Sequence, residues 1–89
     1  SIAEKIVRKM CEKQHYHPGR ASFSELIGVI QNKGVLSRQG LAYLQSIRIH
    51  GNYAVHPEPT DDPLTIRDGM IIANIFQELL EEILEKDLI

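Results

Sequence analysis

The sequence has a single cysteine, no run of 18 apolar residues, and no useful length of the period-two alternation that is typical of β-strands. Because Cys11 has no second thiol to pair with and lies at helical spacing from Val7 and Met10, it is predicted to pack as a small hydrophobe. The missing apolar run excludes a membrane-spanning helix, and the start, SIAEKIVRKM, has no apolar core like that of a signal peptide. We therefore expect a cytoplasmic protein with no membrane partner.

The residue patterns of several enzyme classes are missing too. The chain has no glycine-rich phosphate loop, no serine or cysteine nucleophile triad, and no carboxylate pair of catalytic character. His15 and His17 lie close together, but no Cys, Asp or Glu cluster completes a zinc site around them. We expect no metal and no other cofactor.

Length and composition fit one ordinary globular domain over residues 1–89, with 43% hydrophobic and 25% charged residues. Because the chain starts at Ser1 already in a helical pattern, we expect it to be a fragment or module of a larger protein. Residues 1–50 hold eight Lys or Arg against three Asp or Glu, whereas residues 51–89 hold two against nine. Such asymmetry indicates either a basic face for a polyanion or oppositely charged helices that pack together, and the second is favoured.

Start and stop signals predict three helices before residue 57. The first covers residues 2–16, where apolar residues recur at steps of three and four, and ends at His17-Pro18-Gly19. A second helix follows the capping-box pattern Ser22-Phe23-Ser24-Glu25 and stops at Gly34, a residue suited to a left-handed C-terminal turn. The third begins at Ser37 and runs to about His56, because Pro57 disfavours helix at the residue before it.

A stiff linker with three prolines, residues 57–63, leads to a long last helix that runs to Leu88. Its start is either Asp62 as cap with Pro63 following, or a capping box of Thr65 and Asp68. The apolar stripe of this helix is too wide for one core contact, so it is either central to the bundle or buries a second face, commonly in a twofold homodimer. Its members are Ile66, Met70, Ala73, Phe76, Leu80 and Ile83, widened by Ile72, Ile75 and Leu79. The predicted fold is all-α, a small antiparallel four-helix bundle.

Within the third helix, the stretch RIHGNYAVH gathers most of the polar groups. Arg48, Asn52 and His56 are successive i, i+4 neighbours that share one half-buried face, whereas His50 points elsewhere. Gly51 is unfavourable inside a helix, which indicates close packing by the last helix or a symmetry mate. Arg48, Asn52 and His56 are the candidate catalytic residues. A purely structural role is the alternative, with His56 capping the helix and Asn52 tying down the linker.

The run LQSIRIHGNYAVHPEPTDD, preceded by SFSELIGVIQNKGVLSRQG, resembles a bacterial domain of unknown function found in restriction-endonuclease-like proteins and type I restriction R subunits. That family's pattern is Ile-Arg-x-x-Gly-Asn-x-x-x-His-Pro in a helical bundle, and residues 47–57 match it at each defined position. The resemblance covers about residues 20–88 and implies a bundle like that of the related HEPN superfamily. It also implies that the chain belongs to a restriction or antiphage-defence protein, such as a type I restriction R subunit.

In HEPN ribonucleases, an arginine precedes a histidine by four to six residues, and two chains form a composite, metal-independent site. Here Gly51 stands directly before Asn52, where the nuclease pattern has arginine, and Arg48 lies one turn too early. The preferred hypothesis is therefore a non-catalytic module that mediates dimerisation or contact with a partner domain or nucleic acid. The alternative is an HEPN-type ribonuclease with a composite site at a dimer interface.

A basic face on the first helix gives the candidate contacts to nucleic-acid phosphates. The alternative is a solvated face, the commoner role of such residues. The residues concerned are Lys5, Arg8, Lys9 and Lys13.

Overall fold

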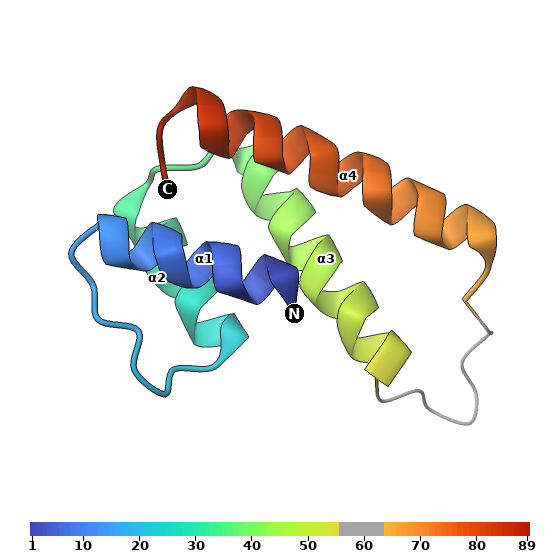
Figure 1. Ribbon diagram of the computed structural model, residues 1–89, viewed down its shortest axis with the longest axis horizontal. Helices are drawn as coiled ribbons and strands as arrows, with labels where there is room; N and C mark the ends of the chain where they lie inside the picture. Colours follow the sequence, from blue (N-terminus) through green and yellow to red (C-terminus); the bar gives the residue numbers. More distant parts are fainter. Residues whose placement is uncertain (56–63) are drawn as a thin grey trace.

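A computed structural model describes residues 1–55 and 64–89, with no description of the side chains of residues 53–55. The elements in chain order are α1 (Ile2–Lys13), α2 (Phe23–Lys33), α3 (Arg38–Val55) and α4 (Ile66–Glu85). No strand occurs among these residues, so the predicted all-α helical bundle is confirmed (Figure 1). None of the helices described is both long and apolar enough to cross a membrane.

The helices pack in chain order, α1 on α2, α2 on α3, and α3 on α4. Figure 1 shows α3 and α4 running in opposite directions, close together where α3 begins and diverging toward the C-terminal end of α3. By contrast, α1 and α2 begin at the same side of the molecule, because the connection between them is long enough to return the chain. The N-terminal ends of α1 and α2 therefore face the space between the diverging halves of α3 and α4.

Helix α1 ends at Lys13, three residues before the predicted end at residue 16. The reason is a hydrogen-bonded turn in which the backbone N–H of Tyr16 donates to the carbonyl of Cys11 and that of His15 to Glu12, both at 2.9 Å. His15 takes a left-handed conformation with φ of 62°, as in a Schellman motif. Sequence patterns do not reveal this stop, because the position is usually held by glycine.

The predicted stop of α2 at Gly34 is confirmed, whereas the capping box predicted at its start is only half formed. The hydroxyl of Ser22 accepts a hydrogen bond from the backbone N–H of Glu25 at 3.1 Å, and the carboxylate of Glu25 reaches back to that hydroxyl at 3.2 Å. Gly34 closes the helix with a φ of 66°. The connection before α2 is held by Arg8, whose guanidinium donates to the carbonyl groups of Gly19 at 3.0 Å and Ala21 at 2.8 Å.

Helix α4 starts at the second of the two predicted caps, a capping box between Thr65 and Asp68, whereas Asp62 lies outside the described residues. It ends at Glu85 and not at Leu88 as predicted. The backbone N–H of Leu88 donates to the carbonyl of Ile83 at 2.9 Å, which turns Leu88 back into the core.

The core lies between α1, α2, the first part of α3 and the C-terminal half of α4. Cys11 is fully buried there, as its helical spacing predicts, and burial raises the pKa of its thiol. The buried residues of the core are Ala3, Val7, Met10, Cys11, Leu26, Ile27, Ile30, Leu36, Leu44, Ile47, Leu79, Ile83 and Leu88.

One carboxylate joins α4 to the start of α3. Glu82 accepts hydrogen bonds from the backbone N–H and the hydroxyl of Ser37, both at 2.6 Å, while Ser37 caps α3 by accepting from the N–H of Gly40 at 2.9 Å. A capping box within α3 would have Glu or Gln at position 40. Gly40 has no side chain to accept from the Ser37 backbone N–H, and the carboxylate of Glu82 on α4 accepts that hydrogen bond instead.

Burial alone raises the pKa of Glu82, but hydrogen bonds from Lys86 and Ser37 outweigh it and hold that pKa below its ordinary value. The Lys86 ammonium lies 2.6 Å from the Glu82 carboxylate. The ionised form of Glu82 therefore stabilises the junction between α3 and α4.

Candidate functional site

A cleft of about 810 Å³ opens where α3 and α4 diverge. The N-terminal residues of α1 and α2 close one side of it, and the C-terminal half of α3 and the N-terminal half of α4 form the others. Its apolar lining comprises Ile2, Ala3, Phe23, Ile47, Leu64, Ile72 and Phe76. Its lining includes the Arg48 guanidinium, the carboxylates of Glu4 and Asp68, and the imidazole of His50. An apolar floor with charges of both signs suits protein side chains better than a polyanion.

Arg48 and Asn52, two of the three candidate catalytic residues, do line this same cleft. Arg48 is half-buried as predicted, and its Nε donates to the side-chain oxygen of Gln45 at 3.0 Å. Asn52 is exposed, so the prediction of a half-buried position is wrong for this residue. His56 lies outside the described residues, and the catalytic assignment stays a prediction.

His50 also lines the cleft, although the helical geometry placed it apart from Arg48 and Asn52. Because α3 diverges from α4, the cleft is wide enough for side chains from two sides of α3 to line it. On the opposite wall, hydrogen bonds from the backbone and hydroxyl of Thr65 hold the pKa of Asp68 below its ordinary value, and the nearby His50 adds to this effect. Asp68 is thus an anion near His50 at the N-terminal end of α4.

The predicted close packing of Gly51 against the last helix is wrong. A side chain built on Gly51 would meet no atom within 4 Å among the described residues, whereas one built on Gly40 would collide with the carboxylate of Glu82. The closely packed glycine of α3 is therefore Gly40. The capping pattern that begins at Ser37 and lacks Glu or Gln at position 40 was the signal for it.

Replacing Gly51 with alanine should raise the free energy of unfolding by about 1 kcal/mol, because alanine is the better helix former and has room here. Thermal or urea unfolding of the dilute chain measures this. Gly28→Ala, also within a helix and without a neighbour inside 4 Å, is the matched control. A loss of stability in Gly51→Ala alone would contradict the open surroundings.

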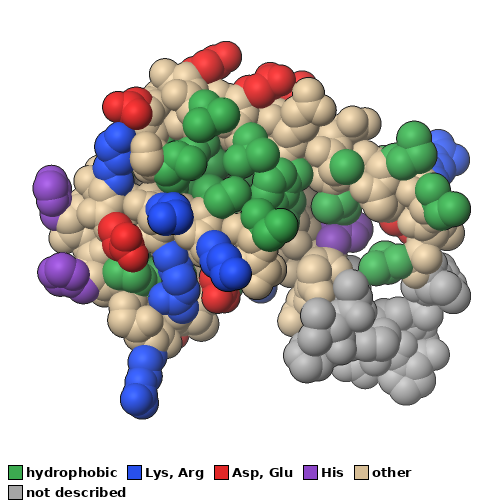
Figure 2. Space-filling view, in the orientation of Figure 1, with side chains coloured by type: hydrophobic (Ala, Val, Ile, Leu, Met, Phe, Trp, Pro, Cys, Tyr) green, Lys and Arg blue, Asp and Glu red, His purple; other side chains and the backbone are tan. Residues whose placement is uncertain are grey.

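The four basic residues of α1 have different surroundings. Figure 2 shows Lys and Arg side chains gathered over the α1 region, but two of the four are held by other parts of the chain. Arg8 binds the connection before α2, and the Lys13 ammonium lies 3.1 Å from the Asp87 carboxylate and 3.2 Å from the Ile89 carbonyl. Lys5 and Lys9 are exposed. A nucleic-acid contact at this face stays a prediction.

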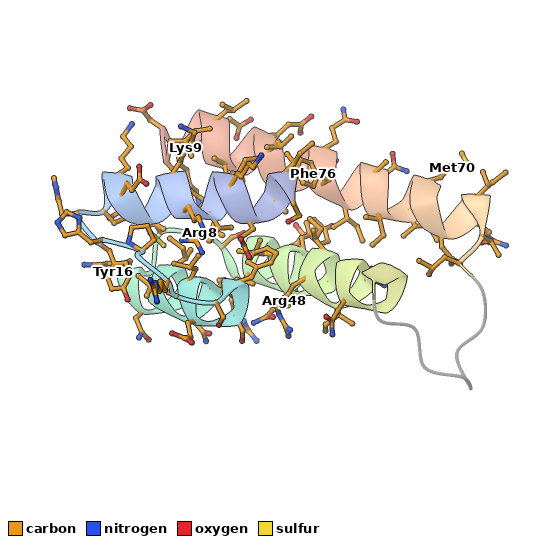
Figure 3. All side chains as sticks on the ribbon, turned by 60° about the horizontal axis from the view of Figure 1, so that its bottom comes forward. Arg8, Lys9, Tyr16, Arg48, Met70 and Phe76 are labelled. Carbon is orange, nitrogen blue, oxygen red and sulfur yellow. The ribbon has the colours of Figure 1, made fainter. Side chains whose placement is uncertain are left out.

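Several large apolar side chains of α4 are exposed. Figure 2 shows hydrophobic side chains gathered between α1 and α4 and continuing along α4 beyond α1. Exposed fractions reach 86% for Ile66, 63% for Met70 and 64% for Leu84. Figure 3 places Met70 on the part of α4 that extends past α1. The wide stripe predicted for the last helix is thus divided, because Leu79 and Ile83 enter the core while its other side faces solvent.

Among the described residues, no three His, Cys, Asp or Glu side chains gather into a group that could hold a metal ion. His15 and His17 are both exposed at the end of α1. Comparisons of the chain with protein-family models, curated proteins and solved structures give no match.

Proposed function

We propose that this chain is a non-catalytic helical interaction module of a restriction-modification or antiphage-defence protein, related to the HEPN-like domain that its sequence resembles. The module binds another protein chain or domain through the exposed apolar side of α4. The observation that carries the proposal is the exposure of Ile66, Met70 and Leu84 on one helix. Large apolar side chains clustered on one surface are typical of protein interaction sites.

The candidate catalytic group supports a structural role better than a nuclease. Arg48 is hydrogen-bonded to Gln45, and the cleft that it lines also carries two carboxylates, Glu4 and Asp68, which repel an RNA phosphate. We therefore expect labelled RNA to stay intact when it is incubated with the purified chain at a concentration that allows dimers. Cleavage that is lost in His56→Ala would contradict this and establish the ribonuclease alternative.

The two methionines of the chain offer a direct test of the interaction surface. Met70 is 63% exposed, whereas Met10 is fully buried. Under mild peroxide, we expect Met70 of the dilute chain to oxidise rapidly and Met10 to stay reduced, as mass spectrometry would show. When a partner covers α4, oxidation of Met70 should slow, while Met10 serves as the internal control.

The same measurement on the full-length gene product extends the test to partner domains in one protein. Met70 that is protected there, or protected as the chain is concentrated, supports the proposal. Met70 that oxidises equally fast in the dilute chain, the concentrated chain and the full-length product would overturn the interaction module.

A further inference from the structure

The exposed side of α4 carries residues at alternating steps of four and three. We name Ile66, Met70, Ala73, Gln77, Leu80 and Leu84 the α4 stripe. Leu80 is half-buried and the other five are exposed. Alternating steps of three and four are the spacing with which two helices pack along each other in a coiled coil. The α4 stripe spans about 27 Å at 1.5 Å per residue, enough for a helix-on-helix contact.

The α4 stripe continues onto α1 and does not stand alone. Ile6 of α1 lines one small crevice together with Phe76 and Leu80 of α4, and Ile2 next to it along α1 is 70% exposed. A partner helix laid on the α4 stripe therefore also covers apolar side chains of α1. This widens the contact beyond what one helix face would bury.

Two of the charges beside the α4 stripe lie about a centre, and Glu78 and Glu85 add negative charge on the same side toward the C-terminal end of the helix. Arg67, Asn74 and Glu81 follow one another at seven-residue steps, so they lie along one line of the helix surface. All three are exposed, and within the described part of the chain neither Arg67 nor Glu81 forms an ion pair. Asn74 lies midway, with the opposite charges about 10 Å from it on either side.

We propose that α4 binds α4 of a second copy of this chain in an antiparallel arrangement, with the twofold axis next to Asn74. This inference rests on the proposed function and names its partner. In this arrangement, Arg67 of each copy faces Glu81 of the other, so that two ion pairs flank the contact. Ile66 meets Leu84, Met70 meets Leu80, and Ala73 meets Gln77 of the second copy.

The charges select this partner and this direction. A surface that presents a positive and a negative group at equal distances from a midpoint is complementary to itself after a twofold rotation. Parallel helices would place Arg67 level with Arg67 and Glu81 level with Glu81, which loses both attractions. The polar Gln77, placed opposite Ala73 near the axis, disfavours shifted alignments in which it would face the larger apolar residues.

The test uses charge exchange, measured by sedimentation equilibrium at low salt. We expect wild-type chain to dimerise at about 0.1 mM, and Arg67→Glu or Glu81→Arg alone to raise the dissociation constant about tenfold, because each places two like-charged pairs in the dimer. The double variant R67E/E81R should recover wild-type association. Mixing the two single variants should give mostly heterodimers by native mass spectrometry, since both pairs are then opposite in charge.

A matched control is Arg20→Glu before α2, which is exposed and is expected to leave the dissociation constant within about twofold. Ile66→Asp tests the apolar contact itself. If Ile66→Asp abolishes the dimer and the charge variants do not affect it, the antiparallel arrangement is overturned and the interaction surface stands. A wild-type chain that is monomeric at about 1 mM overturns the second copy as partner, and protection of Met70 in the full-length product then decides the proposed function.

Discussion

Replacing Ile83 with alanine should lower the free energy of unfolding by about 2–5 kcal/mol, whereas replacing its neighbour Leu84 should change it by less than about 0.5 kcal/mol. Ile83 is 1% exposed within the core, so its truncation removes buried contacts and leaves a cavity. Leu84 is 64% exposed on the α4 stripe and loses little on truncation in the monomer. Urea unfolding of the dilute chain measures both changes.

The same pair separates folding from association. In concentrated chain, Leu84→Ala should weaken self-association, because Leu84 contributes apolar surface only to the partner contact. For Ile83→Ala, the loss appears already in the dilute chain, where no partner is bound. Equal losses of monomer stability in both variants would contradict the division of α4 into a core side and an interaction side.

The helix ends that the sequence predicts correctly are those set by capping residues close together in the chain. The hydroxyl of Ser22, the left-handed Gly34 and the pairing of Thr65 with Asp68 are caps decided by residues within four positions of each other. The ends of α1 and α4 were predicted three residues too late, because His15 and Asp87 take left-handed conformations without being glycine. At those ends, the hydrogen bonds of the turn and the burial of Leu88 outweigh the intrinsic preference of the residue.

The candidate site depended more on the path of the chain. Helical periodicity places Arg48 and Asn52 on one face, and the structure confirms that they line one cleft. Helical angle alone placed His50 apart from them, and the cost of glycine in a helix suggested close packing at Gly51, but neither pattern reports where α4 lies relative to α3. The width of the cleft depends on the angle between the two helices, which no local pattern in the sequence determines.

Replacing Gly40 with alanine should change stability in opposite directions depending on residue 82. In the wild type, the added methyl group displaces the carboxylate of Glu82 from Ser37, and we expect the free energy of unfolding to fall by about 1–2 kcal/mol. In a Glu82→Ala background that carboxylate is absent. Alanine at position 40 should then raise the free energy of unfolding by about 0.5–1 kcal/mol, because alanine is the better helix former. A double-mutant cycle by urea unfolding measures the difference.

Acid provides an independent check on the same junction. Because the folded-state pKa of Glu82 lies below its ordinary value of 4.5, its contribution is fully present above that pH and is lost as the pH falls through the folded-state pKa. We therefore expect Glu82→Gln, itself about 1–3 kcal/mol less stable than the wild type at neutral pH, to approach the wild type on acidification. A gap that stays constant at all pH values, or a Gly40→Ala effect of the same sign in both backgrounds, would show that Glu82 does not cap α3 across the helices.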